Sequence, residues 1–245
     1  MEKKVLITGA NRGIGKALVE KFAQSGYGIV ACSRKKTEDF EEYLKCITDK
    51  YGINVMASYF DMENERELKY ELRDIISKVK KIDVLINNAG YSTSTLFPMI
   101  SADELRKEMQ INYISPIIIS QIISRSMVKN GGGNIINIAS VSGVRNEEGR
   151  LAYGSSKAAL IFATKTMSIE LAKNNIRVNA ISPGFIDTDM WRNRSEKLYE
   201  KVLSETPIGR QGKAKDIVNI VFYLASDQAS YITGQNIIVD GGRLI

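Results

Sequence analysis

Histidine is missing from the 245-residue chain. Its absence excludes a Ser-His-Asp hydrolytic triad and any zinc site with histidine ligands. The two cysteines, Cys32 and Cys46, are too few for a disulfide framework and form no metal-ligand pattern; their apolar or amphipathic surroundings predict reduced thiols in the core or near the surface. Acid-base chemistry in this protein therefore has to use Tyr, Lys, Asp, Glu or Cys.

Long apolar runs are missing too. No apolar stretch reaches the ~18 residues that a membrane helix needs, and the N-terminus passes into a strand pattern without the apolar segment of a signal peptide. We therefore expect a cytoplasmic protein that does not enter a membrane. The net charge of +6 favours anionic ligands in a general way. Without a long basic run or an aromatic-basic alternation, however, the sequence does not predict nucleic-acid binding.

The composition is that of a globular protein, with 44% hydrophobic and 25% charged residues. Strand patterns cover residues 4–8, 27–32, 54–60, 83–86, 134–139, 176–181 and 236–239. Helical patterns alternate with them, at residues 37–51, 63–80, 101–111, 114–129, 153–174 and 214–226 and directly after residues 9–15. This alternation predicts an α/β fold with one doubly wound parallel sheet of about seven strands and helices on both faces. With no linker or repeat, we expect a single domain over residues 1–245.

A glycine-rich turn joins the first expected strand to the helix that follows. The turn reads Thr8-Gly9-Ala10-Asn11-Arg12-Gly13-Ile14-Gly15. Glycines at such a junction let the backbone approach a pyrophosphate, and the helix N-terminus offers N–H groups and a positive dipole end to it. The context predicts a dinucleotide site, although the same glycines also suit an ordinary tight turn.

The end of the second expected strand indicates which dinucleotide is bound. An NAD site places Asp or Glu there for the ribose 2′-hydroxyl, whereas the 2′-phosphate of NADP needs cations. This chain has Ser33 and Arg34 followed by two lysines, with no acid before Glu38. Arg12 in the glycine turn adds a second guanidinium. We therefore predict NADP(H); a solvated basic loop is the alternative for the two lysines.

The stretch from Ser140 to Lys157 contains a candidate catalytic set. Tyr153 and Lys157 are four residues apart and share one face of a helix, where an ammonium lowers the pKa of a neighbouring phenol. Ser140 ends a strand, where its hydroxyl can polarise a carbonyl. A lone Tyr-x-x-x-Lys is more often a solvated helix face, so the prediction depends on the rest of the chain.

Ligands of such sheets bind at the carboxyl ends of the strands. Several of the residues singled out above, and others like them, directly follow expected strands: Gly9, Arg34, Asp61, Asn87, Ser140 and Pro183. Their side chains are therefore expected to converge on one crevice.

Together these motifs resemble the short-chain dehydrogenase/reductase family. The resemblance covers essentially the whole chain and rests on the ordered set of Thr8 to Gly15, Asn87 to Gly90, Asn112, Ser140, Tyr153, Lys157 and Pro183-Gly184. Within the family, residues 181–190, 231–235 and 240–242 are most similar to 3-oxoacyl-[acyl-carrier-protein] reductases, although many sugar and alcohol reductases share them. The resemblance implies a Rossmann-type fold and NADPH-dependent reduction of a carbonyl.

The resemblance also implies a role for individual residues. Tyr153 would donate the proton, Lys157 would lower its pKa and hold the nicotinamide ribose, Ser140 would polarise the carbonyl and Asn112 would hold a proton-relay water. Asp61 would meet the adenine, Asn87 to Gly90 would line the cofactor floor, and Thr188 would contact the nicotinamide amide. Ser142 is a weaker candidate for the polariser and fits a turn residue better. The expected cofactor-binding set is Thr8, Gly9, Asn11, Arg12, Gly13, Ile14, Gly15, Ser33, Arg34, Asp61, Met62, Asn88, Ala89, Gly90, Tyr153, Lys157, Pro183, Gly184, Ile186 and Thr188; no metal is expected.

The substrate is left open by the sequence. A 3-oxoacyl thioester fits the resemblance, but the loop from Arg145 to Arg150 is charged where carrier-protein reductases have small or amide residues. A polar sugar or a small charged carbonyl is therefore an alternative. A non-catalytic NADP-binding regulatory protein is a third, disfavoured because Tyr153 and Lys157 are both present. By resemblance, residues 189–212 form a lid over the substrate; a pair of surface helices is the other interpretation.

The resemblance also implies a homotetramer, or a dimer. The helices near residues 101–129 and 151–174 would pair across subunits. The run Ile117 to Ile123 is apolar enough to be buried on more than one side, although a well-packed monomer core explains it equally well.

Overall fold

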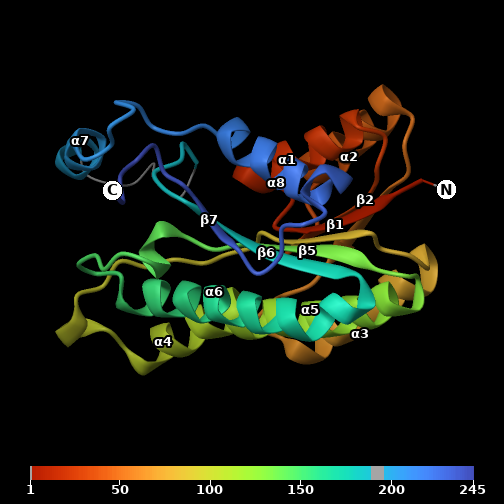
Figure 1. Ribbon diagram of the computed structural model, residues 1–245, viewed down its shortest axis with the longest axis horizontal. Helices are drawn as coiled ribbons and strands as arrows, with labels where there is room; N and C mark the ends of the chain where they lie inside the picture. Colours follow the sequence, from red (N-terminus) through yellow and green to blue (C-terminus); the bar gives the residue numbers. More distant parts are fainter. Residues whose placement is uncertain (1, 189–195) are drawn as a thin grey trace.

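A computed structural model of the protein describes residues 2–188 and 196–245. Its centre is a parallel sheet of seven strands in the order β3-β2-β1-β4-β5-β6-β7 (Figure 1). The strands are β1 Lys4–Thr8, β2 Gly28–Ser33, β3 Val55–Tyr59, β4 Val84–Asn87, β5 Gly133–Ile138, β6 Ile176–Pro183 and β7 Asn236–Val239. The order reverses between β1 and β4, and such a switch point leaves a crevice at the carboxyl ends of the strands.

Helices cover both faces of the sheet (Figure 1). They are α1 Gly13–Gln24, α2 Glu38–Tyr51, α3 Glu65–Val79, α4 Ala102–Met109, α5 Ser115–Lys129, α6 Leu151–Leu171, α7 Glu196–Ser204 and α8 Ala214–Ala225. One face carries α1, α2 and α8, and the other carries α3, α4, α5 and α6. The predicted fold class is therefore confirmed. Among the described helices, none is both long and apolar enough to cross a bilayer.

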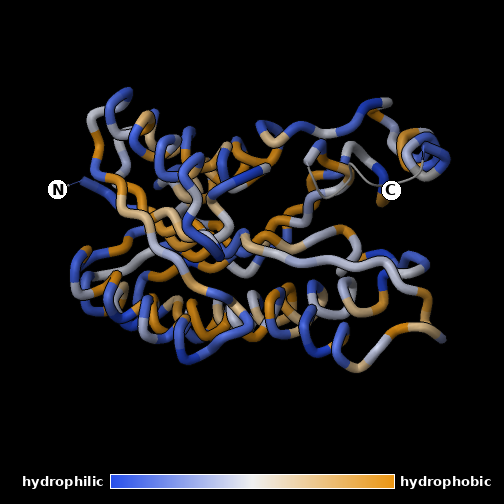
Figure 2. The backbone as a smooth tube through the Cα atoms, turned by 180° about the vertical axis from the view of Figure 1, so that it is seen from behind, coloured by the Kyte–Doolittle hydropathy of each residue, from blue (hydrophilic) through white to orange (hydrophobic). Residues whose placement is uncertain are grey.

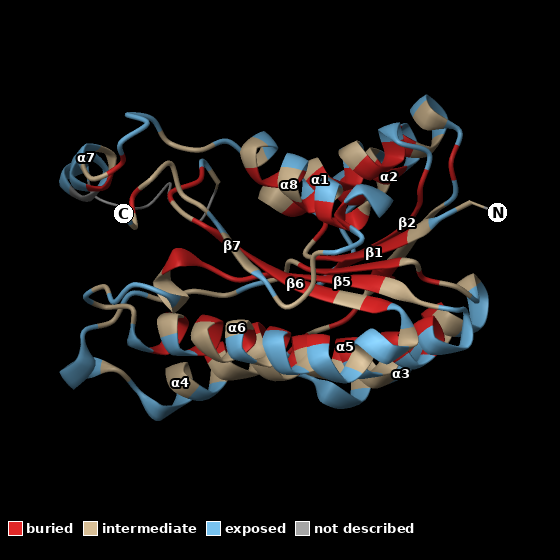
Figure 3. Ribbon diagram, in the orientation of Figure 1, coloured by how far each residue is buried: buried red, intermediate tan, exposed pale blue. Residues whose placement is uncertain are grey.

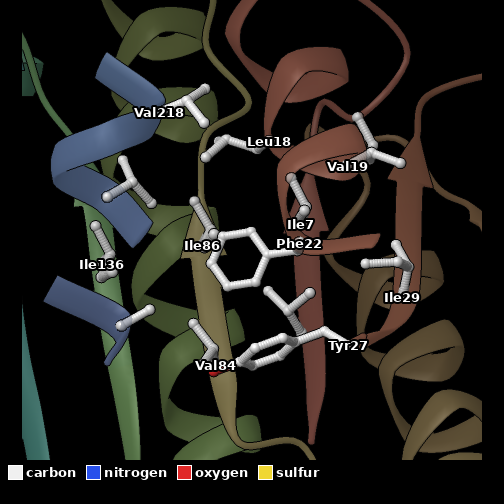
Figure 4. Packing of buried hydrophobic residues seen from close by; sticks show 14 of the residues in the cluster. Ile7, Leu18, Val19, Phe22, Tyr27, Ile29, Val84, Ile86, Ile136 and Val218 are labelled. Carbon is white, nitrogen blue, oxygen red and sulfur yellow. The ribbon is translucent and has the colours of Figure 1, made fainter. Parts of the chain in front are cut away.

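The sheet separates two hydrophobic cores. On the α1 side, Phe22 is fully buried and packs edge-on against Tyr27, at a centroid separation of 5.1 Å (Figure 4). Phe22 also packs edge-on against Phe222, at 5.2 Å. On the other side, Leu68 and Ile119 are fully buried against the sheet. The central strands are buried on both faces while the outer helix surfaces are exposed, and hydrophobic residues concentrate along the sheet (Figures 2 and 3). Continuous apolar strands of this kind form because both faces are covered.

The predicted elements differ from those of the structure mainly at their ends. Most of these ends lie within one or two residues of the prediction. The exception is the helix expected at residues 101–111, which the structure divides into α4 and a π-helical turn, Gln110–Ile114, that leads into α5. A π turn inserts one residue into the helical repeat and leaves one backbone carbonyl outside the regular ladder. The turn contains Asn112, one of the candidate catalytic residues.

Candidate active site

A cavity of about 680 Å³ lies over the carboxyl ends of the strands. Of the residues expected to bind the cofactor, all except Gly15 line it, from Thr8 at the end of β1 to Thr188 beyond β6. The volume falls within the range typical of small-molecule sites. Of the residues predicted to converge from strand ends, Gly9, Arg34, Asp61, Ser140 and Pro183 line the cavity and Asn87 does not.

Gly15 lies behind the cavity wall, where it allows a close packing of the turn. A Cβ on Gly15 would lie 2.0 Å from the carbonyl oxygen of Gly9, which makes any larger residue impossible there without a shift of the backbone. Asn88 closes the same junction, because its Nδ2 donates to the carbonyl oxygens of Thr8 (2.9 Å) and Gly9 (3.1 Å). The Thr8 hydroxyl in turn accepts from the backbone N–H groups of Asn88 and Ala89, both at 3.0 Å. These bonds join the ends of β1 and β4.

The nucleotide half of the cavity suits an anionic ligand. The residue before α1, Arg12, makes no side-chain cap, and the first turn of α1 holds no acidic residue. No side chain of this helix start therefore competes with a phosphate for its N–H groups. Arg12, Arg34 and Lys35 all line the cavity, whereas Glu38 does not. This arrangement offers several cations and a helix N-terminus to an anionic ligand.

Tyr153 lies in the first turn of α6 and is 8% exposed. Burial raises the pKa of its phenol, and a hydrogen bond with the side chain of Ser140 opposes that rise. Ser140 lies two residues beyond the end of β5 and lines the same cavity; its Oγ also accepts from the N–H of Ser142 at 3.1 Å. The phenol and the serine hydroxyl are therefore adjacent and reach the same space.

Lys157 follows one helical turn later and is 3% exposed. Its Nζ lies 5.8 Å from the centre of the Tyr153 ring and donates to the carbonyl oxygen of Ile138 at 2.8 Å. Burial lowers the pKa of this amine to about 8. Below that pH the ammonium form predominates beside the phenol, where a positive charge favours phenolate.

Asn112 is fully buried behind these residues. Its Oδ1 accepts from the N–H of Tyr91 (2.9 Å), and its Nδ2 donates to the carbonyl of Tyr91 (2.8 Å) and to Ser156 Oγ (3.0 Å). Ser156 Oγ donates in turn to the carbonyl oxygen of Tyr153 at 2.8 Å. The Asn112 side chain thus connects the loop after β4 to α6, the helix that carries Tyr153 and Lys157. Its role in holding a relay water stays a prediction.

One sequence-based expectation needs correction, and another is met. Asn87 does not line the cavity: it is 2% exposed, and its Nδ2 donates to Ser120 Oγ (3.0 Å) and Asn137 Oδ1 (2.8 Å). Its side chain lies on the α5 side of the sheet, because side chains alternate along β4 and Asn87 faces the same way as Leu85. Ser142 occupies a short 3₁₀ turn and donates to Glu147 Oε2 (3.1 Å), in keeping with a turn residue. Of the expected lid, residues 189–195 lie outside the described residues.

Several charged residues lie at the substrate side, and the role of Arg243 among them was not predicted from the sequence. Arg150, Glu147 and Arg243 all line the cavity beyond Tyr153. Arg243 is 8% exposed, and its Nη1 lies 2.8 Å from Glu147 Oε1. Nearly a hundred residues separate these partners, so no local pattern could have joined them. The charged loop from Arg145 to Arg150 was the one available signal.

Comparison with known proteins agrees with this geometry. A family model described as enoyl-(acyl carrier protein) reductase matches residues 9–243. A 3-oxoacyl-[acyl-carrier-protein] reductase of Aquifex aeolicus is 36% identical over 240 residues, covering 98% of this chain and 96% of that protein. The chain belongs to the short-chain dehydrogenase/reductase family.

Solved structures of family members superpose over nearly the full length. YwfH, an NADPH-dependent reductase involved in bacilysin biosynthesis, is 31% identical with a TM-score of 0.93, covering 99% of this chain and 98% of that one. A 7α-hydroxysteroid dehydrogenase in complex with NADH is 35% identical with a TM-score of 0.90, covering 98% and 93%. This member of the family is an oxidoreductase of the nicotinamide-dependent type, and the expected resemblance is confirmed.

Proposed function

We propose that this protein uses NADPH to reduce a carbonyl group to an alcohol, with Tyr153 as the proton donor. The observation that carries the proposal is that Tyr153, Ser140 and Lys157 line one end of a cavity whose other end is the glycine turn and the basic end of β2. A proton donor and a dinucleotide site thus share one continuous space.

The protein's side chains would act in a simple order. Ser140 donates a hydrogen bond to the substrate carbonyl oxygen and withdraws electron density from the carbonyl carbon. The cofactor, when bound, supplies the hydride. Tyr153 donates its proton to the oxygen as negative charge develops there. Lys157, as ammonium, stabilises the phenolate that remains, and Asn112 and Ser156 hold the helix and loop in register.

The choice of NADPH rests on the charges of the nucleotide half. Among the described residues that line the cavity there, Asp61 is the only acid, and it follows β3 rather than β2. Arg12 and Arg34 supply two planar guanidinium groups, which bind phosphate in bidentate fashion. The name of YwfH specifies NADPH, whereas the steroid dehydrogenase was solved with NADH, so the family accommodates both.

The relatives favour a 3-oxoacyl thioester as the first substrate to test, because the curated relatives at 35–38% identity include 3-oxoacyl-[acyl-carrier-protein] reductases. A polar or charged small carbonyl is the second candidate. The observation in its favour is the charged wall of Arg150, Glu147 and Arg243 beside Tyr153. We also infer a cytoplasmic location, as expected from the sequence.

The deciding experiment is a comparison of wild type with Tyr153→Phe. NADPH oxidation is followed with acetoacetyl thioester and a panel of keto-sugars and small ketones. We expect turnover of at least one carbonyl by wild type and a loss of about 10³-fold or more in Tyr153→Phe, with NADPH binding retained. Wild-type turnover by the variant would disprove the assigned mechanism. Tight NADPH binding without turnover of any carbonyl would favour the regulatory alternative.

A further inference from the structure

Glu108 is a buried acid to which the proposed reaction assigns no role. It belongs to α4, is fully buried, and does not line the cavity. Its Oε1 accepts from the N–H (2.7 Å) and the hydroxyl (2.5 Å) of Thr93, in the loop after β4. Its other oxygen, Oε2, has no hydrogen-bond partner among the described residues. Because burying a polar atom without a partner is costly, this carboxyl group calls for a physical explanation.

Glu108 and Asn112 act together on the loop after β4. The two residues are four positions apart, along α4 and the π turn that follows it. Glu108 accepts from the N–H of Thr93, and Asn112 Oδ1 accepts from the N–H of Tyr91 at 2.9 Å. Asn112 also donates to Ser156 of α6, at 3.0 Å. The loop and α6 are therefore positioned by the same stretch of helix.

The same stretch of helix approaches the amine of Lys157. A Cβ placed on Gly90 would lie 3.4 Å from Asn112 Oδ1 and 3.6 Å from Lys157 Nζ, so the amide and the amine meet at one glycine. Glu108 lies one helical turn before Asn112. Burial lowers the pKa of Lys157, and the negative charge of Glu108 opposes that change. The carboxyl group is thus close enough to act on the buried amine.

Charged groups of both signs act on Glu108 itself. Burial raises its pKa, the hydrogen bonds from Thr93 and the charge of Arg150 lower it, and the charge of Glu104 raises it. Arg150 contacts the same loop, since its Nη1 donates to the carbonyl oxygen of Thr93 at 3.1 Å. Two hydrogen-bond donors on Oε1 and a guanidinium nearby favour the carboxylate form.

Tyr153 is under the influence of the same charges. Burial raises the pKa of its phenol, while the hydrogen bond with Ser140 and the charge of Arg150 lower it. The charges of Glu108 and Glu147 raise it. Removal of the charge of Glu108 alone would therefore lower the pKa of the phenol as well as that of the amine.

We propose that Glu108 is a positioning residue whose carboxylate holds the loop of residues 91–93 against α6 and serves as the buried counter-charge of Lys157. This inference rests on the proposed carbonyl reduction and extends it to a residue outside the cavity wall. The Lys157 amine donates to an uncharged group, the carbonyl oxygen of Ile138 at 2.8 Å. A buried ammonium is costly without a negative charge, and Glu108 supplies that charge without entering the space of the substrate.

The first test is a titration of Lys157. Glu108→Gln removes the charge and keeps an oxygen that accepts from Thr93, and Lys157 should then bind its proton about tenfold more weakly. NMR of protein labelled with [¹³Cε]lysine measures the titration, and the Lys157 resonance is assigned by its loss in Lys157→Met.

Two further variants separate the charge from the fold of α4. Glu108→Asp keeps the charge and should change the proton affinity of Lys157 by less than about threefold. Asp103→Asn is the matched control, because it removes a carboxylate from the same helix at a side chain that is 94% exposed. It should leave the Lys157 titration unchanged. A Lys157 titration that is the same in Glu108→Gln and wild type would overturn the proposal.

The pH profile of carbonyl reduction gives a second measurement. In Glu108→Gln the phenol of Tyr153 and the ammonium of Lys157 should both lose their protons at lower pH. The alkaline limb of kcat/KM should therefore move to lower pH, and the loss of activity should be about tenfold greater at pH 9 than at pH 6. A residue that only held the loop would lower activity by the same factor at every pH, and that result would reject the counter-charge.

The titration distinguishes this inference from the proposed function, because it needs no substrate. Weaker proton binding by Lys157 in Glu108→Gln supports the counter-charge even if the protein reduces no carbonyl of the panel. An unchanged titration, together with turnover that depends on Tyr153, would leave the reductase proposal standing and reject this one.

A measurement on the wild type covers the case in which Glu108→Gln does not fold. Protein labelled with [¹³Cδ]glutamate should show Glu108 as a carboxylate at pH 7, with its resonance assigned by its loss in Glu108→Asp. A neutral Glu108 at that pH would overturn the proposal, because an uncharged acid is no counter-charge.

Discussion

The proposed role of Lys157 needs a buried ammonium beside Tyr153, and burying that charge lowers the stability of the folded protein. Its amine has an ordinary pKa of 10.5 and a pKa of about 8 in the folded protein, because burial disfavours the charged form. The unfolded chain therefore binds this proton more tightly than the folded one. The resulting destabilisation is fully present below pH 8, shrinks as the pH rises from 8 to 10.5, and is absent above that.

Replacement of Lys157 by Met should consequently stabilise the cofactor-free protein while abolishing its activity. At pH 7 we expect a higher free energy of unfolding, by up to about 3 kcal/mol less the lost hydrogen bond to Ile138. The gain should vanish near pH 10.5. Urea unfolding of wild type and variant at pH 7 and at pH 10 measures the difference in the free energy of unfolding at each pH. A variant that is less stable than wild type at pH 7 would contradict the proposed cost of burying the charge.

Arg34 is the residue proposed to select the cofactor, through its guanidinium in the cavity wall. Arg34→Asp removes a guanidinium from the cavity and introduces a carboxylate that repels a 2′-phosphate and binds a ribose 2′-hydroxyl. We expect kcat/KM for NADPH to fall by about 10- to 100-fold and the preference to move towards NADH. Lys36→Asp is the control, because Lys36 is exposed and lies outside the cavity wall. An unchanged ratio of NADPH to NADH in Arg34→Asp would reject the 2′-phosphate role.

At the scale of elements, the site depends on the hydrogen bonds between the end of β1 and the loop after β4. The Thr8 hydroxyl accepts from two successive backbone N–H groups, those of Asn88 and Ala89. Asn88 in turn binds the carbonyls of Thr8 and Gly9. This reciprocal bonding fixes the glycine turn relative to the loop that follows β4, and hence the cradle for the cofactor.

Thr8→Val keeps the shape of the side chain but leaves those two N–H groups without their acceptor. We expect a loss of about 1–3 kcal/mol in the free energy of unfolding, accompanied by weaker NADPH binding. Thr48→Val on α2 removes a hydroxyl that bonds only within its own helix, to Leu44, and should change neither value by more than about 0.5 kcal/mol. Chemical denaturation and fluorescence titration with NADPH compare the two. Equal effects in both variants would show that the contact between the strands has no special role.

The elements also show what a sequence can and cannot indicate. Strand ends and glycine spacing predicted the wall of the cavity because both are local patterns. The π turn at Asn112 was not predictable, since one inserted residue hardly alters the hydrophobic repeat. Asn87 was placed correctly along the chain but on the wrong side of the sheet. The approach of Arg150 to Ser92 and of Arg243 to Glu147 depends on tertiary contacts, which carry no local signature.

At the scale of the whole molecule, the exposed face of α6 is relevant to the expected homotetramer. Phe162 and Ile169 lie seven residues apart on one face of α6 and are 73% and 79% exposed. Large apolar side chains in such a row often mark a protein interface. Together with the family resemblance, they support the homotetramer proposed from the sequence, with α6 at a subunit contact.

Light scattering tests the assembly. We expect a particle with four times the 27.3 kDa mass of the chain and a smaller one for the double variant Phe162→Glu, Ile169→Glu. Tyr70→Glu alters an equally exposed aromatic on α3 and should leave the mass unchanged. A wild-type monomer would exclude the tetramer. A tetramer that survives the double variant would place the contact elsewhere.

The junction between Thr8 and Asn88 has a further consequence for how the protein matures. The two residues are 80 positions apart, so their contact forms only after a long loop has closed. A partly synthesised chain that ends before β4 has the glycine turn but lacks half of the pocket. A dinucleotide is therefore expected to bind the folded chain in preference to the partial one, and by mass action a concentration 100 times its dissociation constant would add about 2.7 kcal/mol to the folding equilibrium.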